Sequence, residues 1–246
     1  MPSPRIFIRM LDSRSFLAPA PVLCFTSFAM HYQAIPTGSF AANAYLLVAA
    51  DASAAALVDP GADPDRLLAA IAAAGAPLRH ILLTHGHPDH ASALAPILAA
   101  HPEALVLVHP RDLAWLAAPV NTIPPDYPPP APIPPARLAP WPAPDADFPF
   151  PVAGARCRPL HVPGHTPGGI AYLFPDDALL LTGDTLFRES VGRTDLPGGS
   201  ARELAASLRL LARLDDSLTI LPGHGDSSTL RHELAYNYFL QNLNRA

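Results

Sequence analysis

Four side chains of metal-ligating type fall within six consecutive residues of this chain, in the text Thr84-His85-Gly86-His87-Pro88-Asp89-His90. The text directly follows the apolar residues 81–83. A buried imidazole or carboxylate costs free energy unless a partner satisfies it, so packing alone does not require this cluster. A divalent metal ion satisfies all four groups, and nitrogen and oxygen ligands suit zinc, iron or manganese. The cluster therefore predicts a metal site at the end of a buried strand.

Three more polar residues each directly follow a glycine at the ends of expected strands. They are His165 in Gly164-His165-Thr166, Asp184 in Gly183-Asp184-Thr185 and His224 in Gly223-His224-Gly225. Proteins of the α/β class place their chemistry at strand ends, so we expect these residues to join the first cluster. Five histidines and two aspartates are enough ligands for two metal ions, which can share a bridging carboxylate.

The elements that must position these residues alternate between strand and helix patterns. Helix 63–74 has Asp63 as its expected N-cap and Pro64 at its first position. Ser200, with Glu203 three positions later, predicts a capping box for helix 200–214. The alternation indicates an α/β sandwich. We expect strands at 43–48, 55–58, 79–83, 104–108, 155–161, 169–174, 178–181 and 217–221, and further helices at 89–100, at 111–116 and from 230.

Residues 119–151 differ from the rest because they are rich in proline. Proline cannot donate to a sheet ladder, so we expect extended polyproline segments or a rigid loop. Two interpretations stay open. The loop is either a lid beside the active site, since long loops in compact domains are often functional, or a spacer over the surface.

Composition excludes several classes of function. Half of the 246 residues are hydrophobic and 15% are charged, which is ample for a large core. The net charge of −5 and the lack of a basic run argue against nucleic acid as a partner. No apolar run is long enough to predict a membrane span. Two cysteines, Cys24 and Cys157, form no disulfide framework, which predicts a cytoplasmic protein; the oligomeric state is left open.

The first 29 residues have a composition of their own. Their apolar part contains Pro19 and Pro21, which a secretory signal would lack. A transit peptide is compatible with the composition, and Met30 is an alternative true start. We expect 1–29 to be a disordered extension and 30–246 to be the domain.

The order of the seven candidate ligands resembles the metallo-β-lactamase superfamily over about residues 31–240. The resemblance implies an α/β fold, the four-layer αββα sandwich, with metals at one edge of its two sheets. Carried over position by position, it implies a first metal held by His85, His87 and His165, a second held by Asp89, His90 and His224, and Asp184 as the bridge between them.

The text Gly183-Asp184-Thr185-Leu186-Phe187, followed by Gly192-Arg193-Thr194-Asp195, is similar to the glyoxalase II-like branch, the hydroxyacylglutathione hydrolases. The implied reaction is thioester hydrolysis, with S-D-lactoylglutathione as the nominal substrate. A hydroxide bridging two divalent ions would attack the carbonyl carbon. The expected metal is Zn²⁺, with Fe or Mn as alternatives. Asp89 would orient that hydroxide. Arg193 would anchor a substrate carboxylate, unless it pairs with Asp195 instead.

Full-length glyoxalase II makes its glutathione contacts from a C-terminal helical domain, whereas this chain continues only to Ala246 after Gly225. Recognition of glutathione is therefore left open.

Other reactions stay open on the same fold. Persulfide dioxygenases also resemble this chain, and they use only the equivalents of His85, His165 and Asp184 around one iron. The metal centre would equally serve lactone or phosphodiester hydrolysis. A non-catalytic binding protein on this fold would have degraded ligands, and none of the seven is missing.

Overall fold

The computed structural model describes residues 30–116, 118, 120–121, 127 and 130–243. The expected extension 1–29 lies outside these residues. No helix in the described part of the chain has the length and apolar character needed to cross a bilayer.

Ten strands form two five-stranded sheets. The first sheet has the order β1 (Met30–Thr37), β2 (Ala42–Ala49), β3 (Ala55–Val58), β4 (Leu78–Leu82) and β5 (Leu105–Leu107). The second has the order β12 (Ser228–Thr229), β11 (Thr219–Pro222), β8 (Leu179–Gly183), β7 (Ile170–Phe174) and β6 (Arg158–His161). The short strands β9 (Leu186–Phe187) and β10 (Ser190–Val191) pair with each other.

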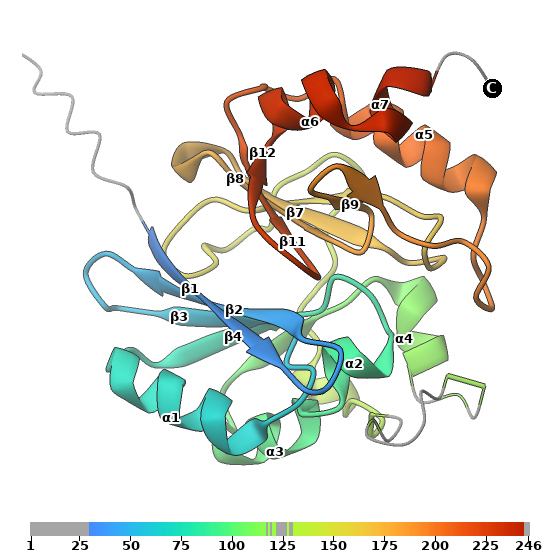
Figure 1. Cartoon of the computed structure of the whole chain (residues 1–246). Helices are drawn as coiled ribbons and strands as arrows, with labels where there is room; N and C mark the ends of the chain where they lie inside the picture. The colour runs from blue at the N-terminus through green and yellow to red at the C-terminus, as the bar shows by residue number, and fades with distance from the viewer. Residues whose placement is uncertain (1–29, 117, 119, 122–126, 128–129, 244–246) are drawn as a thin grey trace, which may run out of the picture.

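Helices cover the outer face of each sheet (Figure 1). Those that follow the first sheet's strands are α1 (Pro64–Ala74), α2 (Pro88–Ala91), α3 (Leu94–Ala100) and α4 (Pro110–Leu116). Those of the second half are α5 (Ala201–Leu211), α6 (Leu230–Tyr236) and α7 (Tyr238–Asn242), and short 3-10 turns occupy Pro135–Arg137 and Pro175–Asp177. The layers run helix, sheet, sheet, helix, which confirms the αββα sandwich.

Three apolar clusters hold these layers together. Leu57 and Ile81 of the first sheet pack with Leu67 of α1 and Ile97 of α3. A second cluster lies between the sheets and includes Leu82 from one and Tyr172, Phe174 and Leu181 from the other. The third joins the second sheet to α5, through residues such as Leu204 and Leu208. Burial on both faces explains why the central strands read as continuous apolar runs.

The metal-ligating segments leave both sheets at the same edge. Strand β4 runs parallel to β3 and β5, and β8 runs parallel to β11, so their carboxyl ends lie together. Main-chain hydrogen bonds join the sheets there. The Asn43 amide donates to the Gly223 carbonyl over 2.7 Å, and the Ile170 amide donates to the Thr84 carbonyl over 2.8 Å.

The two expected helix caps have different outcomes. Ser200 caps α5, because its hydroxyl accepts from the Glu203 amide, but the Ser200 amide donates to the Gly164 carbonyl over 2.8 Å and not to Glu203, so the expected capping box is only half formed. Pro64 is the first residue of α1, but Asp63 makes no side-chain cap. Its carboxylate instead accepts from the Gly38 amide over 3.0 Å, at the turn between β1 and β2.

The expected helix 89–100 is wrong as a single helix, because α2 ends at Ala91 and α3 begins at Leu94. The Ala93 amide donates to the Pro60 carbonyl over 3.0 Å, so it is not available to the helix. Gly61 approaches the Asp89 carbonyl so closely that a Cβ there would overlap it. The chain after β3 therefore interrupts the helix. The last helix is likewise divided, since Asn237 caps α7.

The described residues of the proline-rich segment pack against the core. Ile133 belongs to the cluster under the first sheet, and Phe148 belongs to the cluster between the sheets. The Ala139 amide donates to the Val106 carbonyl beside β5. None of the described residues of 119–151 lines the cavity at the metal-ligating side chains, and the lid and spacer interpretations both stay predictions. Tyr127 reaches that region indirectly, because its hydroxyl accepts from the Phe40 amide.

We expect Gly164→Ala to destabilise the protein more than Gly75→Ala. Both glycines have positive φ, +133° and +67°, so an added Cβ strains either backbone by about 1–2 kcal/mol. A Cβ on Gly164 would also overlap the backbone of Leu204 in α5, whereas Gly75 has open space. Urea unfolding of the two variants measures the difference, and equal losses would show that α5 does not constrain the His165 turn.

Candidate metal centre

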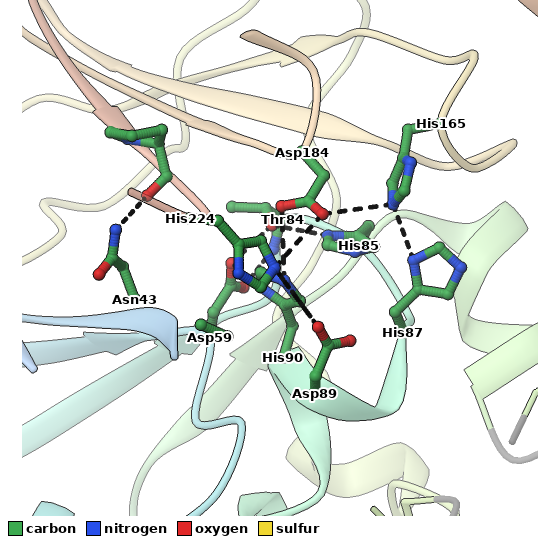
Figure 2. A network of polar contacts seen from close by, with 12 residues as sticks. Asn43, Asp59, Thr84, His85, His87, Asp89, His90, His165, Asp184 and His224 are labelled. Atoms are coloured by element: carbon green, nitrogen blue, oxygen red, sulfur yellow. Dashed lines mark hydrogen bonds and ion pairs between the residues drawn. The ribbon is translucent and has the colours of Figure 1, made fainter. Parts of the chain in front are cut away.

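One group of ligands comes from two loops at the edge of the sandwich. His85 and His87 follow β4, and His165 follows β6. All three are buried, and each offers a nitrogen within 4.8 Å of the others. Nε2 of His165 lies 2.8 Å from Nδ1 of His87 (Figure 2). The structure thus brings together the three residues expected at the first metal.

A second group lies beside the first. Asp89 and His90 belong to α2, and His224 follows β11. The Nε2 atoms of His90 and His224 are 3.2 Å apart, and Oδ2 of Asp89 is 3.4 Å from Nε2 of His224. These are the three residues expected at the second metal.

Asp184 reaches both groups from the end of β8 (Figure 2). Its Oδ1 atom lies 3.4 Å from Nε2 of His90. Its Oδ2 atom lies 3.5 Å from Nε2 of His165 and 3.6 Å from Nε2 of His224. A carboxylate in this position can contribute a ligand to each group.

On four of the five imidazoles, Nδ1 makes a hydrogen bond to a protein acceptor, so Nε2 is the nitrogen left to bind a metal. His165 Nδ1 donates to the Arg193 carbonyl over 2.8 Å, and His224 Nδ1 donates to the Phe40 carbonyl over 3.1 Å. His90 Nδ1 donates to Asp59 over 3.0 Å. Partners of this kind fix the tautomer of a metal-ligating histidine. Because Nδ1 is occupied in this way, Nε2 is the ring atom that points into the centre.

His85 reaches the same state through a longer chain of contacts. The Thr84 hydroxyl donates to Asp59 over 2.6 Å, so it can only accept from His85 Nδ1, 3.0 Å away. His85 Nε2 is then a lone-pair donor. It is buried and has no hydrogen-bond partner among the described residues, and the same holds for Oδ1 of Asp184. Two orphaned ligand atoms in one buried site fit a bound metal cation.

The electrostatics of the site agree with this fit. Burial, helped by the neighbouring imidazoles, lowers the pKa of His87 to about 3 and that of His85 well below its usual range, so both stay neutral. Burial also lowers the pKa of His90, but Asp184 and Asp89 outweigh it and raise that pKa to about 10. Burial raises the pKa of Asp89, yet His90 and His224 hold it low. His85 and His87 are therefore neutral donors, and the raised pKa of His90 reflects the carboxylates beside it, whose negative charge a cation would balance.

Sequence reasoning missed Asp59, which directly follows β3. Besides His90 and the Thr84 hydroxyl, it accepts from the Thr84 amide over 2.7 Å, and its side chain is only 2% exposed. One carboxylate thus orients imidazoles in both groups. An aspartate at the end of an apolar run was the available signal.

Asp112 and Asn121 were also missed. Asp112, fully buried in α4, accepts from the Gly86 amide, the Gly168 amide and the Thr166 hydroxyl. Burial raises its pKa although these donors lower it. Asn121 donates to the Gly86 carbonyl over 2.6 Å. No local pattern marks either residue as part of a site.

Arg193 lies at the edge of the centre, but its guanidinium is paired elsewhere. It donates to Asp195 over 2.7 and 2.8 Å, and 62% of its side chain is exposed. Its backbone carbonyl is the part that contacts His165. The residue still lines the cavity over the metal-ligating side chains, which has a volume of about 350 Å³ and is also bordered by Phe40 and Leu196.

An αββα sandwich with this donor set at the common edge of its sheets is the arrangement of a metal-dependent enzyme. The family model described as "Metallo-beta-lactamase superfamily" matches residues 37–224. The chain belongs to the metallo-β-lactamase superfamily.

Several relatives resemble most of the chain. It is 33% identical to a probable metallo-hydrolase of Streptococcus pyogenes, over 80% of this chain and 84% of that protein. It is 31% identical to the hydroxyacylglutathione hydrolase GloC of Haemophilus influenzae, over 86% of this chain and 98% of the relative.

Solved structures agree with the fold. The BLEG-1 B3 metallo-β-lactamase superposes with a TM-score of 0.76 at 30% identity, covering 85% of this chain and 99% of that one. TTHA1623 in a di-iron-bound form gives a TM-score of 0.71 at 36% identity. The match covers 85% of this chain and 100% of that one.

Replacing the residue shared by both groups tests the centre. We expect Asp184→Ala to lose most of its bound metal, measured by elemental analysis of protein purified without chelator. Zinc at 100 times its Kd stabilises a native site by about 2.7 kcal/mol, so the variant should also lose the zinc-dependent rise in Tm. Asp226→Ala is the matched control, because its carboxylate is 85% exposed two residues after His224. Equal metal content in both variants would contradict the role of Asp184.

Proposed function

We propose that this protein is a dinuclear metal-dependent thioester hydrolase that acts on a hydroxyacylglutathione, with zinc as its resident metal. One observation carries the proposal of two ions. The ligands divide into two groups of three, and Asp184 lies within 3.4–3.6 Å of imidazoles in both. Two ions would use all seven of these side chains.

The side chains present fit two divalent ions. His85, His87 and His165 would hold one, Asp89, His90 and His224 the other, and Asp184 both. When bound, such ions supply Lewis acidity and a water molecule acidic enough to be a nucleophile near neutral pH. Water then adds to the thioester carbonyl carbon, and the carbon–sulfur bond breaks to release a thiolate and a carboxylic acid.

Asp89 is the residue we assign to orient the nucleophile. Its carboxylate lines the cavity, and one of its oxygens lies 3.4 Å from Nε2 of His224. His90 and His224 keep its pKa low despite burial, so it stays ionised and accepts a hydrogen bond from water. An ionised acceptor at this position therefore orients the water molecule through that hydrogen bond.

The substrate class rests on similarity and on the composition of the cavity. This chain aligns with 98% of the length of GloC of Haemophilus influenzae. That relative is named as a hydroxyacylglutathione hydrolase. The cavity here combines a cationic side chain, Arg193, with the apolar Phe40 and Leu196. A small acyl thioester whose thiol portion carries a carboxylate suits that combination.

Cytoplasmic location stays a prediction from the sequence, and so does the absence of a nucleic-acid partner.

A direct assay tests this function. The full chain, loaded with zinc, should hydrolyse S-D-lactoylglutathione and should be much slower with a lactone, a phosphodiester and a β-lactam. A single iron per chain together with oxygen uptake on glutathione persulfide would replace the proposal with the dioxygenase interpretation. A preference for the β-lactam would replace the substrate class alone.

Arg193 provides a test of substrate binding. We expect Arg193→Ala to raise KM for S-D-lactoylglutathione about tenfold, roughly the contribution of one charge-assisted hydrogen bond, with little change in kcat. Asp195→Asn is the matched variant, since it removes the partner that now holds the guanidinium, and it should lower KM or leave it unchanged. An unchanged KM for Arg193→Ala would show that Arg193 serves only the ion pair.

A further inference from the structure

One buried carboxylate joins the two loops that supply the first group of ligands. Oδ2 of Asp112 accepts from the Gly86 amide over 2.9 Å, and Gly86 lies between His85 and His87. The same oxygen accepts from the Thr166 hydroxyl over 2.8 Å, and Thr166 directly follows His165. Oδ1 accepts from the Gly168 amide over 2.5 Å. All three donors therefore lie in the two loops that carry the first-group ligands.

The structure around Asp112 is built for this contact. The side chain is fully buried, and Gly168 approaches it so closely that a Cβ would overlap the carboxylate. The other side of the Gly86 peptide is held as well, because Asn121 donates to the Gly86 carbonyl and to the Leu116 carbonyl, the latter at the end of α4. The turn between His85 and His87 is thus fixed through both its amide and its carbonyl.

The second group is held by different residues. Asp59 accepts from His90, and the Phe40 carbonyl accepts from His224. Asn43 donates to the Gly225 carbonyl over 2.9 Å and to the Pro222 carbonyl over 3.1 Å, on either side of His224. None of the hydrogen bonds that Asp112 makes in the described chain reaches this group.

We propose that Asp112 is a positioning residue for the ion held by His85, His87 and His165, and not for the ion held by Asp89, His90 and His224. The inference rests on the proposed two-ion centre. It predicts that the two ions can be separated experimentally. Replacing one carboxylate in α4 should weaken the binding of the first ion and leave the binding of the second unchanged.

The conservative substitution Asp112→Asn should disturb the ligand loops for a geometric reason. The two amide donors approach different oxygens, and an asparagine has only one oxygen. Its nitrogen would face an N–H donor, so one loop must move. Losing a residue that orients metal ligands costs about 10- to 100-fold in metal affinity.

The experiment measures zinc affinity of the metal-free full chain by competition with a chromophoric chelator, in two backgrounds. His224→Ala disables the second group, and there we expect Asp112→Asn to weaken zinc binding about 10- to 100-fold. His165→Ala disables the first group, and there the same change should leave zinc affinity unaltered. Asn121→Ala and Thr166→Val, which each remove a donor near Gly86 or His165, should act in the same direction but less strongly, and they replace Asp112→Asn if that variant does not fold.

Glu233→Gln is the control for a purely structural effect. Glu233 is also fully buried and also accepts from three donors, Ser228, Glu189 and Asn237, none of which is a ligand. It should lower Tm as much as Asp112→Asn does while leaving zinc affinity unchanged in both backgrounds. The inference is overturned if Asp112→Asn weakens zinc binding equally in both backgrounds, or if it weakens zinc binding in neither. A wild-type chain that binds only one zinc ion overturns the proposed two-ion function instead, and the His224→Ala background still tests Asp112.

Discussion

The arrangement of the centre depends on where the imidazoles place their one proton. Four of them donate it from Nδ1 to a fixed acceptor: the Thr84 hydroxyl, Asp59, the Arg193 carbonyl or the Phe40 carbonyl. Each therefore presents its Nε2 atom to a common space. Since these acceptors come from both halves of the sandwich, the centre exists only where the edges of the two sheets meet.

The fold supplies that meeting point through ordinary packing. The cluster between the sheets, with Tyr172 and Phe174 facing Leu82, sets how the two halves face each other. Tyr172 adds a polar contact, because its hydroxyl donates to the Leu83 carbonyl directly before the ligand segment. Parallel pairing then brings the ends of β4 and of β8 and β11 to one edge, where short loops carry the ligands.

The candidate ligands could be proposed from the sequence because their types and spacing are local. His85, His87, Asp89 and His90 stand in one short text, and glycine turns mark the other three. The sequence could not predict Asp112, Asn121 or the Phe40 carbonyl, whose partners lie far along the chain and, for the carbonyl, do not depend on residue type. The single helix expected at 89–100 failed for the same reason, since the interruption comes from Pro60 and Gly61.

Membership of the superfamily and the paired ligand groups together make a two-ion hydrolase the simplest account of the chain. Anomalous scattering from crystals of the full chain grown with zinc measures this most directly. The account predicts two zinc peaks, one among His85, His87 and His165 and one among Asp89, His90 and His224, with Asp184 contacting both. A single peak at the first group, with His90 and His224 bonded only to protein or water, would contradict it.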